Sequence, residues 1–297
     1  MANFGKRSTA EDVTEGADLA GKTALVTGIN SGIGEEAGRV LSMRGARVIG
    51  TARTLEKAET ACGTFSGETI AVECELSDPA SVAGAIRRVS EAVDRIDILI
   101  GNAGIMALPK LETVNGMELQ FATNHLGHYQ LVTGLLDRMG QGSRIVLVSS
   151  SAHFQAPSVG IDFDNIDGSS SYSAFRAYGQ SKLANVLFAN ELARRLKDRN
   201  VTANSLHPGV IQTNLGRHMN PLIGIAFGIF GFWAFKTIAQ GAATTCYVAA
   251  HSDNENVTGK YFADCKQVPA LAISGSEELA GRLWEYSEDR VQALTAS

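Results

Sequence analysis

A glycine-rich turn between an apolar run and a helical pattern constrains the fold of this chain more than any other feature. The run Thr23–Thr27 (TALVT) is short, β-branched and bounded by glycine, which is typical of a buried strand. The turn reads TGINSGIG, and a helical pattern follows from Glu35. Glycines let a pyrophosphate reach the first amides of a helix, where the dipole favours negative charge. The turn therefore predicts a dinucleotide site with these cofactor-binding residues: Gly28, Asn30, Ser31, Gly32, Ile33 and Gly34.

Apolar runs and helical patterns alternate along the rest of the chain. Further strands are predicted over residues 46–51, 69–76, 97–101, 144–149, 201–207 and 259–264, and helices over 35–44, 79–93, 119–136 and 178–197. Because the strands are continuous apolar runs, we expect a parallel sheet with helices on both faces. The predicted fold is one doubly wound Rossmann α/β domain over residues 1–297, with a largely parallel sheet of about seven strands. Residues 1–19 form a polar arm, and residues 210–238 an apolar flap over the substrate.

The composition argues against several classes of protein. Asp and Glu (31) outnumber Lys and Arg (26), so nucleic-acid binding, which needs clustered cations, is not expected. The cysteines lack metal-like spacing and the polar N-terminus lacks the apolar core of a signal peptide, which favours a cytoplasmic protein with reduced thiols. The apolar stretch Pro221–Phe235 is shorter than the ~20 residues of a membrane-spanning helix, so no transmembrane span is expected. We interpret it as part of the flap, with a membrane contact or an oligomer surface as the alternatives.

The end of the second predicted strand indicates which dinucleotide binds. Proteins of this fold that bind NAD carry an acidic residue there, which holds the ribose hydroxyls. This chain has Thr51, Ala52 and Arg53 instead, and an arginine suits a 2′-phosphate. We therefore predict NADP(H) in preference to NAD(H). The alternative is that Arg53 is a solvated loop cation.

A tyrosine and a lysine lie one helical turn apart in the segment AYGQSKLANVLF. Tyr178 and Lys182 would share one face of a helix, either as surface decoration or as a proton donor beside a cation. Tyr172 and Arg176 have the same spacing. Spacing alone does not choose between the two pairs.

Several motifs, taken together and in order, resemble the short-chain dehydrogenase/reductase family. They are TGINSGIG, the NAG of Asn102–Gly104, the serines at 149–151 and YGQSK. The chain is most similar to the retinol-dehydrogenase-like branch, through the stretches TNHLGHY (123–129), SKLANVLFANELARRL (181–196), HPGVIQTNL (207–215) and GKYFADCK (259–266).

The resemblance implies an active site of four residues: Asn124, Ser150, Tyr178 and Lys182. It selects Tyr178 over Tyr172 because the family places lysine four residues after the tyrosine. In this family the tyrosine is the acid/base, and the serine holds the substrate oxygen. The lysine and the positive charge of an oxidised nicotinamide would together lower the pKa of the tyrosine. The asparagine organises a water that links the lysine to solvent. Further cofactor contacts are implied at Glu75, Leu76, Asn102, Ala103, Gly104, Tyr178, Lys182, Pro208, Gly209 and Thr213.

The chain departs from the family pattern in three places. Gly101 replaces the first asparagine of the usual NNAG, and Glu75 replaces an aspartate that commonly holds the adenine. We expect these two changes to tune cofactor affinity and to leave the chemistry unchanged. The spacer between Ser150 and Tyr178 is long and rich in serine and glycine, which leaves the size and shape of the substrate open.

The predicted function is NADP(H)-dependent interconversion of an alcohol with a ketone or aldehyde, on a bulky lipophilic small molecule. The alternative is a non-catalytic, nucleotide-sensing protein of the same fold; a sugar-nucleotide epimerase fits the turn spacing poorly. A hydrolase using Ser150 and His153 lacks a G-x-S-x-G elbow, and a metal site at His125 and His128 lacks further ligands, so no metal is expected. We expect a homodimer or homotetramer, and these residues either contribute to its interface or face their own core: Leu187, Phe188 and Leu192.

Overall fold

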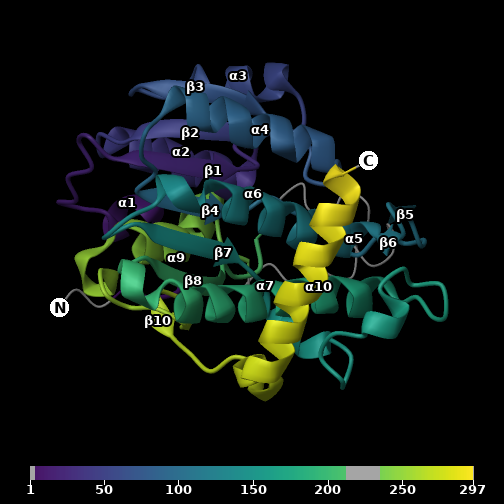
Figure 1. Cartoon of the computed structure of the whole chain (residues 1–297). Coiled ribbons are helices and arrows are strands. Elements are labelled where there is room, and N and C mark those ends of the chain that lie inside the picture. The colour runs from purple at the N-terminus through teal and green to yellow at the C-terminus, as the bar shows by residue number, and fades with distance from the viewer. Residues whose placement is uncertain (1–3, 212–234, 297) are drawn as a thin grey trace.

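The strands form one large sheet whose order places the glycine-rich turn near its centre. The computed structural model describes residues 4–211 and 235–296 (Figure 1). The sheet has eight strands in the order β10-β9-β8-β7-β4-β1-β2-β3. Seven pair in parallel: β1 Thr23–Thr27, β2 Arg47–Ala52, β3 Thr69–Glu73, β4 Ile98–Gly101, β7 Arg144–Val148, β8 Thr202–His207 and β9 Tyr261–Ala263. The eighth, β10 (Lys266–Gln267), is antiparallel to β9, and a separate hairpin joins β5 (Thr113–Val114) to β6 (Met117–Glu118).

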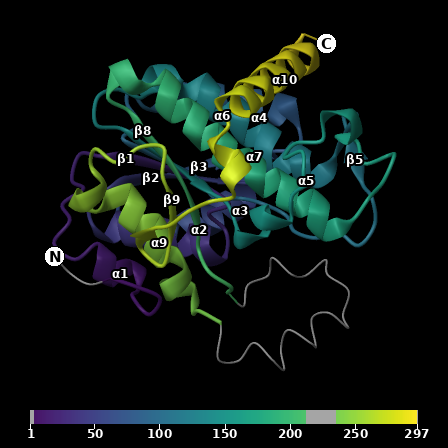
Figure 2. The same ribbon diagram turned by 90° about the horizontal axis from the view of Figure 1, so that it is seen from below.

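Helices cover both faces of the sheet, as the continuous apolar strands predict. One face carries α1 (Ala10–Val13), α2 (Gly32–Met43), α3 (Leu55–Cys62) and α9 (Ile238–Ala250). The other carries α4 (Pro79–Ala92), α6 (Gly127–Leu135), α7 (Ala174–Arg195) and α10 (Glu277–Thr295), and Figure 2 shows α10 and α9 on opposite sides. Successive residues of β1 enter different cores, Leu25 with α4 and α6 and Val26 with α2 and α9. The doubly wound α/β prediction is confirmed, and the short strand β10 brings the sheet to eight strands.

The N-terminal arm is built into the domain from residue 10 onward. Ala10 and Val13 of α1 are fully buried in the core that α2 and α9 share. The Thr9 side chain caps α1, and Arg39 of α2 pairs with Glu11. A short apolar face in a polar segment is a weak sequence pattern, and it left α1 unpredicted.

The helical region predicted over residues 119–136 is interrupted. A three-residue helix α5 (Leu119–Phe121) leads into a π-helical turn over Ala122–Leu126, and α6 starts at Gly127. A Cβ at Gly127 would lie 2.1 Å from the Leu76 carbonyl oxygen, so the chain passes closer to the β3–α4 loop than a side chain would allow. Such turns are frequent at functional sites, and a helical period does not reveal them.

The structure bears differently on the expected oligomer interface and on the expected apolar flap. Leu187, Phe188 and Leu192 of α7 are all buried in the chain's own core, so they do not form an oligomer face. Of the flap predicted over 210–238, residues 212–234 lie outside the described residues, as does Thr213. Ile211 and Lys236 form a parallel bridge, so the two ends of that segment lie side by side. No helix among the described residues is long and apolar enough to cross a membrane.

Candidate active site

The glycine turn packs tightly against the loop that follows β4. A Cβ at Gly34 would lie 2.3 Å from the Gly28 carbonyl oxygen and 2.5 Å from Asn102 Nδ2, so a side chain there would displace one or the other. Gly28 and Gly32 both have positive φ, 69° and 62°, which a side chain disfavours. Ser31 stands at the N-cap of α2 but makes no side-chain capping bond. The first amides of α2 therefore have no cap from the Ser31 side chain, and the uncapped amides of a helix N-terminus favour an anion.

Thr27, the last residue of β1, ties that turn to the NAG loop. Its hydroxyl oxygen accepts hydrogen bonds from the amides of Asn102 and Ala103, both at 2.9 Å. Asn102 Nδ2 in turn donates to the Thr27 carbonyl at 2.8 Å. The two neighbouring central strands thus end in one hydrogen-bonded unit, with the glycine turn on its edge.

The residues expected at the adenosine end differ in their exposure and in their hydrogen bonds within the protein. Arg53 follows β2, is exposed, and makes no ion pair or side-chain hydrogen bond within the described part of the chain. The Glu75 carboxylate instead accepts from the amide and hydroxyl of Ser77, at 3.1 and 2.8 Å. Leu76 is buried, 6% exposed. Of these residues, only Arg53 presents a free charged group to a ligand.

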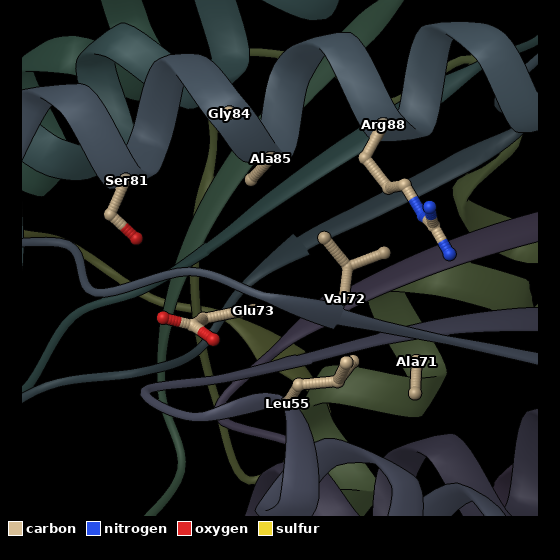
Figure 3. Close-up of a pocket in the computed structure, with 8 residues that line it drawn as sticks. All are labelled: Leu55, Ala71, Val72, Glu73, Ser81, Gly84, Ala85 and Arg88. Atoms are coloured by element: carbon tan, nitrogen blue, oxygen red, sulfur yellow. The ribbon is translucent and has the colours of Figure 1, made fainter.

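A hollow of about 330 Å³ lies beside the edge strand β3, between α4 and the start of α3 (Figure 3). Ser81 and Arg88 extend from α4 toward the strand, and Leu55 closes the other side. None of the four predicted active-site residues lines it. It is distinct from the place where the catalytic side chains meet.

Tyr178 and Lys182 lie one turn apart at the start of α7, as their spacing predicts. Both are buried, and Lys182 Nζ is 5.7 Å from the centre of the Tyr178 ring. The Ser150 side chain lies near enough to the Tyr178 phenol to lower its pKa. A Cβ at Gly179 would lie 2.6 Å from the Ala152 carbonyl oxygen, so this glycine lets α7 approach the turn after Ser150. The structure therefore brings the predicted serine, tyrosine and lysine together.

Burial dominates the pKa of both members of this pair. It raises the pKa of Tyr178 to about 12, and the nearby Ser150 side chain only partly opposes the rise. Burial also lowers the pKa of Lys182 to about 8. The lowering expected from Lys182 together with the charge of an oxidised nicotinamide stays a prediction. At neutral pH the phenol is protonated.

The structure distinguishes Ser150 from Ser149. The Ser149 hydroxyl is buried and donates to the Lys182 carbonyl at 2.7 Å, which makes it part of the β7–α7 packing. Ser150 is partly exposed, accepts from the Ala152 amide and reaches Tyr178. The choice of Ser150 from the family pattern agrees with this geometry.

His153 is engaged with the backbone at both ring nitrogens. Nδ1 lies 2.6 Å from the Ser150 carbonyl oxygen, which can only accept, so Nδ1 carries the proton. Nε2 accepts from the Leu271 amide at 3.0 Å. His153 therefore has no free nitrogen to act as a base on the Ser150 hydroxyl, which argues against a hydrolase. The hydrogen bond from His153 to the Ser150 carbonyl was not predicted from the sequence.

Asn124, in the π-helical turn, fastens the NAG loop beside Lys182. Its Oδ1 accepts from the Ile105 amide at 2.8 Å, and its Nδ2 donates to the Ile105 carbonyl and to Ser181 Oγ, both at 2.9 Å. A Cβ at Gly104 would lie 3.0 Å from Asn124 Oδ1 and 3.3 Å from Lys182 Nζ. The asparagine side chain is thus committed to protein partners, and its role with a water stays a prediction.

Tyr172 is held away from the site. Its hydroxyl donates to the Leu108 carbonyl at 2.7 Å, and α7 begins two residues later, at Ala174. Tyr172 and Arg176 therefore do not form a pair on one helical face.

Gly209, after β8, is covered by a lysine that the sequence did not single out. Gly209 has a φ of +101°, and a Cβ there would lie 2.7 Å from Lys236 Cδ. Lys236 is buried and pairs with Asp264 at 2.6 Å, while the neighbouring Pro208 is buried as well. The ion pair fixes the loop that follows the sixth predicted strand.

Comparison with known proteins agrees with this geometry. The family model described as short chain dehydrogenase matches residues 22–163 and 164–222. The chain belongs to the short-chain dehydrogenase/reductase family. This family assignment covers both the glycine turn and the Ser150, Tyr178 and Lys182 cluster.

The dehydrogenase is similar to proteins of plants, animals and bacteria. It is 44% identical to short-chain dehydrogenase TIC 32 A, chloroplastic, of Brassica napus, over 99% of this chain and 96% of the relative. It is 40% identical to retinol dehydrogenase 14 of Homo sapiens, over 93% of this chain and 88% of that protein. A solved short chain dehydrogenase from Burkholderia cenocepacia J2315, in complex with NADP, has a TM-score of 0.66 and 25% identity, covering 82% of this chain and 96% of that one. The retinol-dehydrogenase-like resemblance is confirmed.

The two serines provide a test of the site. Ser150→Ala should lower kcat at least tenfold and leave NADPH affinity near that of the wild type, because only Ser150 reaches Tyr178. Ser149→Ala is the matched control and should mainly lower the thermal midpoint, because a buried hydrogen bond worth about 1 kcal/mol is lost. Steady-state kinetics and thermal unfolding measure both. Equal losses of kcat in the two variants would show that Ser150 is not the serine of the site.

Proposed function

We propose that this dehydrogenase is an NADP(H)-dependent oxidoreductase that interconverts a ketone or aldehyde with an alcohol. The observation that carries the proposal is the meeting of the Ser150 hydroxyl with a buried Tyr178 phenol, one turn from Lys182. The neighbouring hydroxyls of Ser150 and Tyr178 suit a substrate oxygen, because one can hold it by a hydrogen bond while the other gives it a proton. The names of retinol dehydrogenase 14 and of the NADP-bound relative support a nicotinamide and an alcohol or carbonyl group.

The residues present fit the nucleotide. The uncapped start of α2 and the glycine turn would hold the pyrophosphate, and exposed Arg53 would pair with the 2′-phosphate. Asn102 to Gly104 and Pro208 to Gly209 would line the path from the adenosine to the catalytic side chains. When bound, NADPH supplies a hydride from its nicotinamide ring.

Tyr178 would act as the proton donor. With NADPH bound, the carbonyl carbon would be reduced while its oxygen takes the phenolic proton from Tyr178, so that the product would be an alcohol. A tyrosine pKa of about 12 keeps that proton in place at neutral pH, as a proton donor to a carbonyl oxygen requires. Ser150 would hold the oxygen, and Lys182 would stabilise the phenolate left behind.

Exposed apolar side chains beside the site favour a lipophilic substrate. Phe154 is 56% exposed and Val159 59%, and both lie in the segment that follows Ser150. Val210, next to Gly209, is 44% exposed. We infer a bulky or long-chain carbonyl compound.

Location and assembly remain predictions. We expect a cytoplasmic homodimer or homotetramer from the sequence, although TIC 32 A carries the description chloroplastic. Sedimentation of the purified protein and fractionation of cells would measure each of them directly.

The proposed activity is tested by NADPH oxidation against a panel of lipophilic aldehydes and ketones. The wild type should reduce at least one of them, and Tyr178→Phe should lower kcat by about a thousandfold while NADPH binding stays near normal. Tight NADPH binding without turnover on any compound would favour the nucleotide-sensing alternative. Substantial activity of Tyr178→Phe on every active compound would remove the tyrosine from its role.

The cofactor preference has its own test. Arg53→Ala should raise KM for NADPH at least tenfold and leave KM for NADH nearly unchanged, because only NADPH carries the 2′-phosphate. Lys197→Ala removes the same charge from an exposed site beyond α7 and serves as the control. An equal rise of both KM values in Arg53→Ala would contradict the assignment.

A further inference from the structure

His128 of α6 lies between the nucleotide turn and the turn that carries Asn124. It is buried, 1% exposed. Its Nδ1 is 3.0 Å from the Asn124 carbonyl oxygen, one helical turn back, and its Nε2 is 2.9 Å from Thr27 Oγ1. Both ring nitrogens therefore have a partner, and the partners belong to different parts of the site.

The chemistry of these partners fixes the direction of each hydrogen bond. A carbonyl oxygen only accepts, so Nδ1 of His128 carries a proton and donates to Asn124. Burial lowers the pKa of His128 to about 4, the bond to Asn124 opposes this, and the charge of Lys182 adds to the lowering. The ring is therefore neutral near pH 7, and Nε2 accepts the hydroxyl proton of Thr27.

This direction leaves Thr27 Oγ1 free to accept, and the amides of Asn102 and Ala103 donate to it. One unbroken series of hydrogen bonds thus runs from the NAG loop through Thr27 and His128 to the backbone of Asn124. The Ile100 carbonyl lies within 3.5 Å of the same Thr27 hydroxyl, but the shorter contact of 2.9 Å to Nε2 favours the histidine as the acceptor.

The space for the imidazole depends on the first departure from the family pattern. A Cβ at Gly101 would lie 3.1 Å from His128 Cδ2 and 2.8 Å from Leu147 Cδ2. Gly101 is therefore in close contact with the ring, and the replacement of an asparagine there bears on the site as well as on cofactor affinity.

We propose that His128 is a positioning residue that couples the nucleotide-binding turn to the catalytic end of the site. Through Thr27 it sets the NAG loop against the glycine turn, and through the Asn124 carbonyl it sets the π-helical turn beside Lys182. It touches neither substrate nor nucleotide in this role. The expected effect of His128 on kcat rests on the proposed function. Its expected effect on the Kd for NADPH does not.

Two isosteric variants separate the two hydrogen bonds. His128→Asn places an amide nitrogen near the position of Nδ1 and keeps the bond to Asn124, while the bond to Thr27 is lost. His128→Gln places an amide oxygen near Nε2 and keeps the bond to Thr27, while the bond to Asn124 is lost. We expect the Asn variant to raise Kd for NADPH about tenfold with kcat within threefold of the wild type. We expect the Gln variant to lower kcat about tenfold with Kd nearly unchanged.

His125 provides the matched control. It is equally buried, in the π-helical turn just before α6, but its Nε2 bonds to Ser287 of α10 and it makes no bond to the nucleotide turn. His125→Gln should lower the thermal midpoint without separating Kd from kcat. If both His128 variants lower the midpoint and change Kd and kcat in parallel, as a packing defect would, the coupling role is wrong.

If a His128 variant does not fold, the hydrogen bond between Thr27 and His128 can be tested from the Thr27 side. Thr27→Val should raise Kd for NADPH as His128→Asn does, and Thr27→Ser, which keeps the hydroxyl, should bind NADPH like the wild type. A Thr27→Val variant with unchanged Kd would overturn the proposal. Kd is measured by NADPH fluorescence and needs no turnover, so a wild type that binds NADPH but reduces nothing would refute the proposed function and leave this test intact.

Discussion

The close approach of the glycine turn to the NAG loop is the contact on which the rest of the site depends. Gly34 lies so close to Asn102 that a side chain on the glycine would collide with the asparagine amide. The Thr27 hydroxyl joins the two loops by accepting from the amides of the NAG loop. Because β1 and β4 are adjacent parallel strands, their carboxyl ends open on the same edge of the sheet. The nucleotide turn and the catalytic side chains can therefore face one another across a short distance.

Desolvation gives this site its chemical character. In water any solvent molecule can donate a proton in place of a tyrosine, whereas Tyr178 is buried with Ser150 as its polar neighbour. The same burial lowers the pKa of Lys182 to about 8, so its proton is held less tightly than that of a surface lysine. Three buried histidines are arranged around these groups as neutral rings, and two of them, His128 and His153, bind the backbone of Asn124 and Ser150.

Much of the fold and site could be predicted from the sequence, because strands, glycine turns and a Tyr–Lys spacing are local patterns. The strand ranges agree with the structure for that reason, whereas the choice of Ser150 among three serines came from the family resemblance. The roles of His128, His153 and Lys236 were missed, since each depends on a partner distant in the chain. The π-helical turn at Asn124 was missed because one extra residue does not disturb an apolar period. The pKa of Tyr178 depends on burial, which spacing does not report.

The central claim is that a hydride passes from NADPH to a carbonyl carbon held beside Tyr178. The most direct measurement uses NADPH labelled with deuterium at C4 of the nicotinamide and mass spectrometry of the product. The account predicts an alcohol with one deuterium on the carbinol carbon. A protein that binds the labelled NADPH, as a shift of its thermal midpoint would show, but forms an unlabelled alcohol or none at all, would contradict it.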